Sequence, residues 1–323
     1  MTRALGTTGL QVTELGFGGG GIGGLYVAVG RDAAMTAMQA AWDEGMRYFD
    51  TAPFYGFGLS ERRVGDFLRD KSGYVLSTKV GKMLRAVPQD QVPDHGFVNP
   101  LPFAVDFDYS YDAVMRSYEF SLARLGLNKI DILYVHDLEK RSLGAACDAH
   151  FASFMNGGLK ALGTLKSAGA IAGFGLGVNE VSAVLDVIDR VKLDCLLLAG
   201  RYTLLDRTGA AEVMPKCLAA GTGVVIGGVF NSGILATGAV PGAHYDYGPA
   251  SADIVARVSG MEAEAKRQGL TLPAAAMRFV LEYPAVASVL TGSAKASSLI
   301  RNAQLLRSVP AVDWAAFNAL AVT

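Results

Sequence analysis

Short β-rich segments alternate with longer helical patterns along this chain, from residue 14 to near the C-terminus. Such alternation indicates repeated βα units, whose strands pair in parallel and whose helices cover the sheet. Eight strands and eight helices can be counted, and eight βα units are the number that closes a TIM barrel. The expected strands are 14–18, 47–50, 75–79, 130–136, 172–177, 195–199, 224–227 and 287–290. We therefore predict an α/β fold, a (β/α)8 barrel of parallel strands with outer helices and long βα loops.

The expected helices are 31–44, 60–70, 111–125, 159–168, 181–190, 207–219, 251–268 and 295–306. Helix 111–125 has the clearest pattern, because apolar residues recur every three or four positions along it. Residues 10–12 resemble half of a small hairpin that could close the N-terminal end of the barrel. Long loops are expected at 81–108 and 229–249. No linker interrupts the pattern, so we expect residues 1–323 to form a single barrel domain.

The composition narrows the range of partners. The chain carries 29 basic and 30 acidic residues without a basic stripe, which argues against binding to nucleic acid. The first residues lack the apolar core of a signal peptide, and no run of about 18 apolar residues could span a bilayer. Cys147, Cys195 and Cys217 are widely spaced, and the histidines show no metal-binding motif. We expect a cytoplasmic protein with reduced cysteines, no metal and no membrane partner. The sequence does not indicate an oligomeric state.

A run of glycines follows the first expected strand and contains a GxGxxG pattern at Gly18, Gly20 and Gly23. A dinucleotide-binding Rossmann unit needs its helix to begin within the glycine turn, whereas here the helix begins near Arg31. Asp50 does end the next strand, as that alternative requires, but the eight-unit count continues without the second domain it needs. We favour an interpretation in which Gly19 and Gly20 let the backbone pass close beneath a flat ligand.

Polar side chains follow three successive strands. Asp50 ends the second expected strand and Tyr55 follows it, Lys79 ends the third, and His136 ends the fourth. In a TIM barrel the chemistry takes place where the carboxyl ends of the strands meet, so we expect these four side chains to lie together. Singly, each could be structural, as a packed tyrosine, a solvated lysine or a core histidine. Their occurrence on consecutive strand ends favours a catalytic group.

The four residue types suit proton exchange with a carbonyl or hydroxyl. A tyrosine can give a proton to a carbonyl or take one from a hydroxyl if its pKa is brought toward the working pH. Lowering that pKa from about 10 toward 7 requires roughly 4 kcal/mol, which a nearby ammonium could supply. We expect Lys79 to supply it to Tyr55 and Asp50 to orient Lys79. His136 is expected to hold the substrate oxygen.

These motifs resemble those of the aldo-keto reductase superfamily. Asp50 with Tyr55-Gly56 matches the family's aspartate and tyrosine, and Lys79 and His136 occupy its lysine and histidine positions. The resemblance covers essentially the entire chain. It implies a (β/α)8 barrel that binds NAD(P) and transfers a hydride at a carbonyl carbon, with the tyrosine as general acid. A barrel enzyme that uses Lys79 as a Schiff-base amine is an alternative from unrelated chemistry.

The resemblance also implies the residues that hold the cofactor. Asn179 is expected near the carboxamide, and Tyr202 is expected to stack on the nicotinamide. The segment Phe230, Asn231, Ser232, Gly233 and Leu235 is expected over the pyrophosphate. Gly292, Ser293, Lys295, Ser298 and Asn302 are expected around the adenosine. NADPH-preferring members place an arginine where Ser298 stands, so we expect NAD rather than NADP. Lys295 or Arg301 could compensate for the missing arginine.

The segments around Asn179 and Tyr202 are similar to a subgroup that contains pyridoxal 4-dehydrogenase and D-threo-aldose (L-fucose) dehydrogenase. Both substrates exist as cyclic hemiacetals, so removal of a hydride gives a lactone directly. Phe54, Phe57, Phe97 and Phe103 could wall an aromatic pocket or simply be core residues. We rank pyridoxal, oxidised to 4-pyridoxolactone, slightly ahead of an aldose such as L-fucose or D-arabinose. A cofactor-binding regulatory subunit with little turnover is the alternative from another class.

Overall fold

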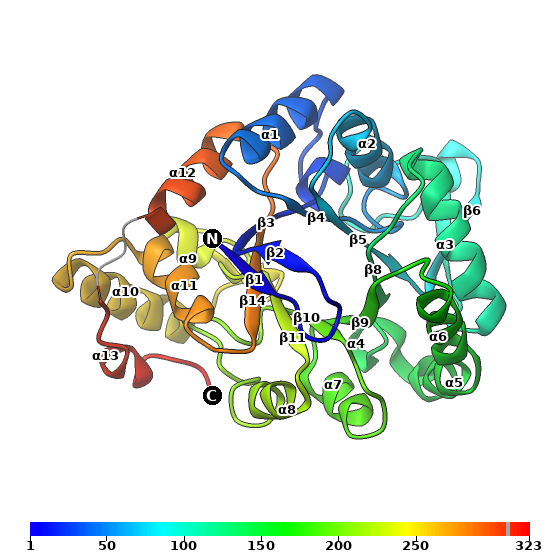
Figure 1. Cartoon of the computed structure of the whole chain (residues 1–323). Helices are drawn as coiled ribbons and strands as arrows, with labels where there is room; N and C mark the ends of the chain where they lie inside the picture. Colours follow the sequence, from blue (N-terminus) through cyan, green and yellow to red (C-terminus); the bar gives the residue numbers. More distant parts are fainter. Residues whose placement is uncertain (308–310) are drawn as a thin grey trace.

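The computed structural model describes residues 1–307 and 311–323. Eight parallel strands form a closed barrel that is surrounded by helices (Figure 1). The strands are β3 (Leu15–Gly18), β4 (Tyr48–Asp50), β5 (Val75–Val80), β8 (Ile132–His136), β9 (Gly173–Val178), β10 (Cys195–Ala199), β11 (Gly223–Gly227) and β14 (Val286–Thr291). All eight expected strands are confirmed within two residues at each end, and the fold is a TIM barrel.

The strand register brings the expected polar residues to one mouth of the barrel. Asp50 is the partner of Ser77 between β4 and β5, and Lys79 is the partner of Tyr134 between β5 and β8. Side chains alternate along a strand, so Ser77 and Lys79 face the same side. Strand β14 pairs with β3 and closes the barrel.

The helices that surround the barrel are α1 (Arg31–Asp43), α2 (Leu59–Leu68), α3 (Tyr111–Leu125), α6 (Leu159–Ser167), α7 (Val181–Ile188), α8 (Val213–Ala220), α11 (Leu272–Leu281) and α12 (Ala296–Arg307). Helix α3 has the bounds that its periodicity predicts. The hydroxyl of Ser110 accepts a hydrogen bond from the Ala113 N–H at its start, and Gly126 ends it in a left-handed conformation. The helix expected at 207–219 begins only at Val213, because residues 207–212 form turns.

The seventh βα unit differs from the prediction. Helix α11 was not expected, yet it contacts β14 and α12 and is the barrel helix of this unit. The helix expected at 251–268 is α10 (Ala252–Arg267), which packs through Ile254 and Val258 against Leu272 and Ala275. It therefore adds an outer layer. The start of α11 carries a recognisable signal, since Thr271 caps it and a proline lies in its first turn.

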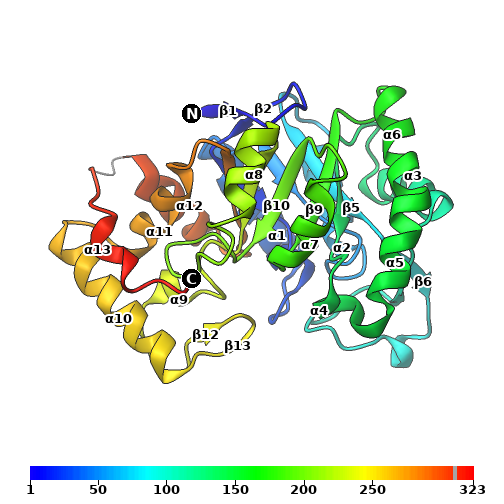
Figure 2. The ribbon, with the colours of Figure 1, turned by 90° about the horizontal axis from the view of Figure 1, so that it is seen from below.

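The N-terminal hairpin closes one end of the barrel, as expected. Strands β1 (Thr2–Ala4) and β2 (Gln11–Thr13) pair in antiparallel fashion. Leu5 and Val12 are buried in one cluster with side chains inside the barrel, which include Tyr48, Ile132 and Tyr134. Figure 2 shows this hairpin at the end of the barrel opposite the short hairpin of β12 (His244–Tyr245) and β13 (Gly248–Pro249).

Parts of the long loops are ordered by pairing of their own. The expected long loop 81–108 contains an antiparallel hairpin of β6 (Lys82–Ala86) and β7 (Phe103–Phe107), so its two ends are paired strands. Short helices extend other connections: α4 (Lys140–Leu143), α5 (Cys147–Ser153), α9 (Ile234–Thr237) and α13 (Ala315–Asn318). No helix among the described residues is long and apolar enough to cross a membrane.

Candidate active site

The structure brings together the four residues expected to form a catalytic group. The ammonium nitrogen of Lys79 lies 2.6 Å from Oδ2 of Asp50 and 4.6 Å from the centre of the Tyr55 ring. The rings of Tyr55 and His136 meet edge to face, with their centres 5.8 Å apart. Residues on three strands and one loop thus converge at the mouth where β4, β5 and β8 end.

A buried ion pair anchors this group. Lys79 is 1% exposed and Asp50 2% exposed, and the Lys79 ammonium also donates to the backbone carbonyl of Thr51 at 2.9 Å. The Ser77 hydroxyl donates to the second oxygen of Asp50 at 2.7 Å. Burial raises the pKa of Asp50 above its usual value, although the charge of Lys79 opposes this shift. A buried pair needs such additional hydrogen bonds, because desolvation of both charges is costly.

The environment of Tyr55 keeps its phenol protonated. Desolvation raises the pKa of Tyr55 well above its usual value, and the carboxylates of Asp50 and Asp137 raise it further. The structure therefore contradicts the expected lowering of the Tyr55 pKa by Lys79. Asp50 balances the charge of Lys79, so little of it remains to stabilise a phenolate.

His136 is held as a neutral hydrogen-bond donor. Burial lowers its pKa well below the usual value, so the imidazole is uncharged at neutral pH. Its Nε2 lies 3.6 Å from Oδ2 of Asp137, and its buried Nδ1 has no partner among the described residues. A carboxylate beside Nε2 favours the tautomer with the proton there, and we assign it so. The Tyr109 hydroxyl donates to the His136 carbonyl at 2.7 Å and fixes the backbone.

A cavity of about 450 Å³ lies beside this group of residues. It is lined by Tyr55, Lys79 and His136 together with aromatic side chains, among them Phe54, His95 and Phe97. The rings of His95 and Phe97 each meet the Phe54 ring edge to face, with centres 5.4 Å apart. This arrangement forms an aromatic wall beside the proposed proton donor.

The remaining expected substrate residues lie elsewhere. Phe57 is fully buried behind the wall, where it packs on Phe97 with ring centres 6.0 Å apart. Phe103 lies on β7 and does not line the cavity. Neither side chain therefore lines the cavity: Phe103 belongs to the β6–β7 hairpin, and Phe57 lies in the turns between β4 and α2, where it is buried. His95 was not predicted, since nothing in the sequence shows which loop residues turn inward.

Two further cavities, of about 310 and 580 Å³, adjoin the first. All three share a wall made of Leu25, Tyr26, Ala199 and Tyr247, so they form one cleft across the barrel mouth. Many of the expected cofactor residues line this cleft: Gly19, Gly20, Phe230, Asn231, Ser232, Gly233, Gly292, Ser293 and Lys295. The cleft runs from Tyr55 at one end to Lys295 at the other, which fits an extended dinucleotide.

The glycines of the first loop have different surroundings. A Cβ on Gly19 would lie 2.6 Å from the Ser60 hydroxyl and 2.8 Å from the Asp50 carbonyl, so this position requires glycine. A Cβ on Gly20 would meet nothing within 4 Å and would project into open space. The loop therefore passes close over β4 and leaves the floor of the cleft flat, as the fit of a planar ligand requires.

Several expected cofactor residues do not line the cleft. The Tyr202 ring packs in the core, where it stacks on Phe279 with centres 5.5 Å apart. The structure therefore does not support the expected contact of Tyr202 with nicotinamide. The tyrosines that line the cleft beside Tyr55 are Tyr247 and Tyr26. Leu235 is fully buried in the cluster that contains α10. Ser298 and Asn302 lie on α12 beyond the cleft lining, half-buried and buried.

The side-chain amides of Asn179 and Asn231 form hydrogen bonds with other residues of the protein. Asn179 lines the catalytic cavity and donates to Glu139 Oε1 at 2.9 Å and Asp137 Oδ1 at 3.2 Å. Asn231 donates to the Gly200 carbonyl and accepts a hydrogen bond from the Thr203 hydroxyl at 2.6 Å. Both residues thus fix loops around the cleft.

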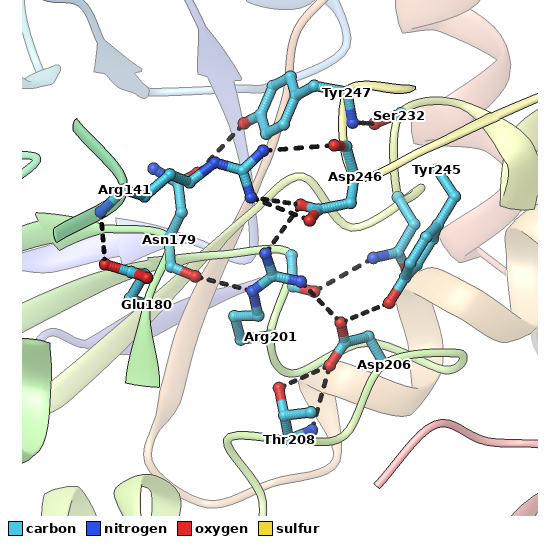
Figure 3. Close-up of polar contacts among 12 residues, drawn as sticks. Arg141, Asn179, Glu180, Arg201, Asp206, Thr208, Ser232, Tyr245, Asp246 and Tyr247 are labelled. Carbon is cyan, nitrogen blue, oxygen red and sulfur yellow. Dashed lines mark hydrogen bonds and ion pairs between the residues drawn. The ribbon is translucent and has the colours of Figure 1, made fainter. Parts of the chain in front are cut away.

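Residues 244–249 form the β12–β13 hairpin, which we call the strap. Hydrogen bonds and ion pairs hold the strap over the cleft (Figure 3). Arg141 donates to both carboxylate oxygens of Asp246 at 2.9 Å, and Arg201 donates to one of them at 2.7 Å. The Tyr247 hydroxyl donates to Asn179 at 3.2 Å, and its N–H donates to the Ser232 hydroxyl at 2.9 Å. The sequence marked this segment only as part of a long loop, because its partners are far away in the chain.

No cluster of three or more possible metal ligands occurs among residues 1–307 and 311–323. The chemistry that the site can perform with its own groups is proton exchange at Tyr55, hydrogen bonding from His136 and binding of a flat ring against the aromatic wall.

Comparisons with known proteins agree with this architecture. A model described as "Aldo/keto reductase family" matches residues 14–321. Pyridoxal 4-dehydrogenase from Microbacterium luteolum is 43% identical, over 97% of this chain and 95% of the relative. D-threo-aldose 1-dehydrogenase from a Pseudomonas species is 36% identical, over 97% of this chain and 95% of the relative.

A solved structure shares the fold at lower sequence identity. The holo form of an aldo-keto reductase from Bacillus halodurans superposes with a TM-score of 0.78 at 23% identity, covering 99% of this chain and 96% of that one. The fold, the family match and the relatives named as dehydrogenases lead to one conclusion. The chain belongs to the aldo/keto reductase family and is an NAD(P)-dependent oxidoreductase.

Proposed function

We propose that this enzyme oxidises a cyclic hemiacetal to a lactone, with pyridoxal as the substrate and 4-pyridoxolactone as the product. The observation that carries this proposal is the aromatic wall of Phe54, His95 and Phe97 beside Tyr55 and His136. A flat pyridine ring can pack on such a wall with its hemiacetal carbon toward the catalytic group. The relative that is 43% identical, a pyridoxal 4-dehydrogenase, supports the same substrate.

Each of the four catalytic residues has a role in this reaction. His136 donates from Nε2 to the hemiacetal oxygen and positions it next to Tyr55. Tyr55 exchanges the hydroxyl proton, taking it during oxidation and returning it during reduction. Lys79 lies beside the phenol ring of Tyr55, and Asp50 holds it there and largely balances its charge. A nicotinamide cofactor bound in the cleft would supply the hydride acceptor. Loss of the hydride from the hemiacetal carbon and of the proton from its hydroxyl then leaves the C=O of the lactone.

The cofactor would occupy the cleft from Tyr55 to Lys295. Gly19 and Gly20 provide a flat floor, and the strap covers the segment around Ser232. Ser298, on the first turn of α12, has no positive charge of its own for a 2′-phosphate. We therefore propose NAD as the preferred cofactor, with NADP as the alternative.

An aldose is the second candidate substrate, and polar side chains in the same cavity favour it. Asp137, Arg141 and Ser142 also line the cavity and could bind sugar hydroxyls. The relative named D-threo-aldose 1-dehydrogenase, 36% identical, supports this candidate. The reaction would be the same, because an aldose is also a cyclic hemiacetal.

The deciding experiment follows absorbance of NADH with purified enzyme, NAD or NADP, and a panel of pyridoxal, L-fucose, D-arabinose and simple alcohols. Turnover of pyridoxal alone supports the first proposal, and turnover of the sugars alone supports the aldose. Absence of turnover with every member of the panel would favour the regulatory-subunit alternative. Borohydride trapping of an adduct at Lys79 would instead favour Schiff-base chemistry, which the buried bond of Lys79 to Asp50 argues against.

A further inference from the structure

A second, largely buried ion pair lies beside His136. Asp137 follows the catalytic histidine directly, and its Oδ2 lies 2.5 Å from the ammonium nitrogen of Lys82. The side chain of Lys82 is 4% exposed and that of Asp137 is 15% exposed. Apolar residues often stabilise such a position as well as an ion pair does, so stability alone does not explain this pair.

The backbone turns the Asp137 carboxylate into the substrate cavity. Asp137 has a φ of +48°, a left-handed conformation that is unfavourable for most residues with side chains. Its side chain lines the cavity together with Tyr55 and His136, whereas Lys82 does not. The Lys82 ammonium lies 3.9 Å from the centre of the Phe54 ring, behind the aromatic wall. The charged group that faces the substrate is thus the carboxylate.

The carboxylate is rigid, ionised and able to accept another hydrogen bond. Lys82 holds one oxygen, and the Asn179 amide donates to the other at 3.2 Å. Burial disfavours the charge, yet the pKa of Asp137 lies below its usual value. With His136 neutral, the positive charges that favour the carboxylate are the ammonium of Lys82, which also donates a hydrogen bond to it, and that of Lys79. Two carboxylate oxygens can accept about four hydrogen bonds, so these two donors leave capacity for a ligand.

The position of this acceptor relates it to the reacting atoms. Its Oδ2 lies 3.6 Å from His136 Nε2, the atom assigned to hold the hemiacetal oxygen. An oxygen bound by Asp137 therefore lies close to the oxygen that reacts. Aldoses carry such a hydroxyl on the carbon next to the reacting carbon, and pyridoxal carries one on the neighbouring ring position.

We propose that Asp137, held by Lys82, accepts a hydrogen bond from a second hydroxyl of the substrate and so selects hydroxylated hemiacetals over their deoxy analogues. This inference rests on the proposed hemiacetal oxidation, and it concerns specificity rather than the hydride transfer. A site built to bond a hydroxyl leaves a buried polar group unpaired when the hydroxyl is missing.

The test compares matched substrates that differ in this hydroxyl alone. D-arabinose is paired with 2-deoxy-D-ribose, and pyridoxal is paired with 3-deoxypyridoxal. We expect wild-type kcat/KM to favour the hydroxylated member of the productive pair by about 100-fold. Asp137→Asn, which keeps the shape and tolerates the left-handed backbone, should reduce this ratio about tenfold. The pair that responds identifies the source of the hydroxyl.

A double variant separates a loss of specificity from a loss of folding. Asp137→Gly with Lys82→Met removes both charges, suits the backbone conformation and approximately keeps the volume of the lysine. Its ratio should fall to within a few fold of one, while NADH affinity and the urea midpoint show that it is folded. A loss of kcat that is equal for both substrates, with the ratio preserved, would overturn the proposal and make Asp137 a residue that positions His136. Absence of wild-type turnover on both pairs refutes the proposed function itself, before any variant is compared.

Discussion

The ammonium nitrogen of Lys79 lies 4.6 Å from the centre of the Tyr55 ring, yet the pKa of Tyr55 is raised. Burial and two nearby carboxylates outweigh the lysine, whose charge is already balanced by Asp50. The phenol is therefore the resting form at neutral pH. It is ready to donate a proton in reduction, but it must lose its own proton before it can accept one in oxidation.

This relationship predicts the pH dependence of the oxidative reaction. Only the deprotonated fraction of Tyr55 accepts the substrate proton, and that fraction grows about tenfold per pH unit below the pKa. The single-turnover rate of NADH formation should therefore rise by about this factor per unit between pH 7 and pH 9. NAD affinity measured over the same range serves as the control. A flat profile would show that the phenol is already ionised when substrate and cofactor are bound.

Tyr55→Phe is expected to abolish turnover while leaving cofactor affinity within a few fold. The substitution removes the proton-exchanging hydroxyl and almost no volume, so the rate should fall by about 100-fold to 10,000-fold. Stopped-flow rates and NADH titration by fluorescence measure the two quantities. Loss of NADH binding in this variant would mean that Tyr55 has a structural role instead.

Asp246→Asn should speed the release of NADH by about tenfold, because Arg141 and Arg201 would lose the charged partner that ties the strap over the cleft. Displacement of bound NADH, followed by stopped-flow fluorescence, gives this rate. Asp189→Asn is the matched control, since it removes an exposed carboxylate paired with Lys216 outside the cleft lining. If both variants released NADH at the wild-type rate, the strap would not limit release.

Ser298→Arg should improve the use of NADP relative to NAD by about tenfold, because a guanidinium offers a fork of donors to a 2′-phosphate. Ser297→Arg is the control, since it adds the same charge at the neighbouring, exposed position of the same helix. The ratio of kcat/KM values for the two cofactors is the measurement. An equal gain in both variants would indicate general attraction to phosphate rather than a specific contact.

The barrel and the convergence of Asp50, Tyr55, Lys79 and His136 could be predicted because both depend on patterns that are local in the sequence. Each strand is a short apolar segment, and Asp50, Lys79 and His136 stand at its end, where barrel geometry brings them together. Helix α11 also carries local signals but was obscured by α10, which occupies the place of a barrel helix in the chain order without packing as one.

The contacts made by loops could not be predicted in the same way. Tyr202 and Tyr247 both lie in loop segments, yet one is stacked in the core and the other walls the cleft. The difference arises from pairings such as Arg141 with Asp246, which are 105 residues apart in the chain. Similarly, His95 lines the cavity and Phe103 does not, and the segment after His95 is held by pairing of Gly96 with Tyr26 and of Val98 with Gly24, far away in the chain.

The wall that the three cavities share has a consequence for how this enzyme can diverge. Tyr247 lines all three cavities, the one beside Tyr55 and His136 and the two that adjoin it. A substitution of Tyr247 would change the fit of the substrate and the proposed binding of the cofactor together. A change that improves one can therefore weaken the other. Substitutions in the connection between β6 and β7 can change the substrate range more independently. His95 and Phe97 lie there, and of the three cavities they line only the one beside Tyr55.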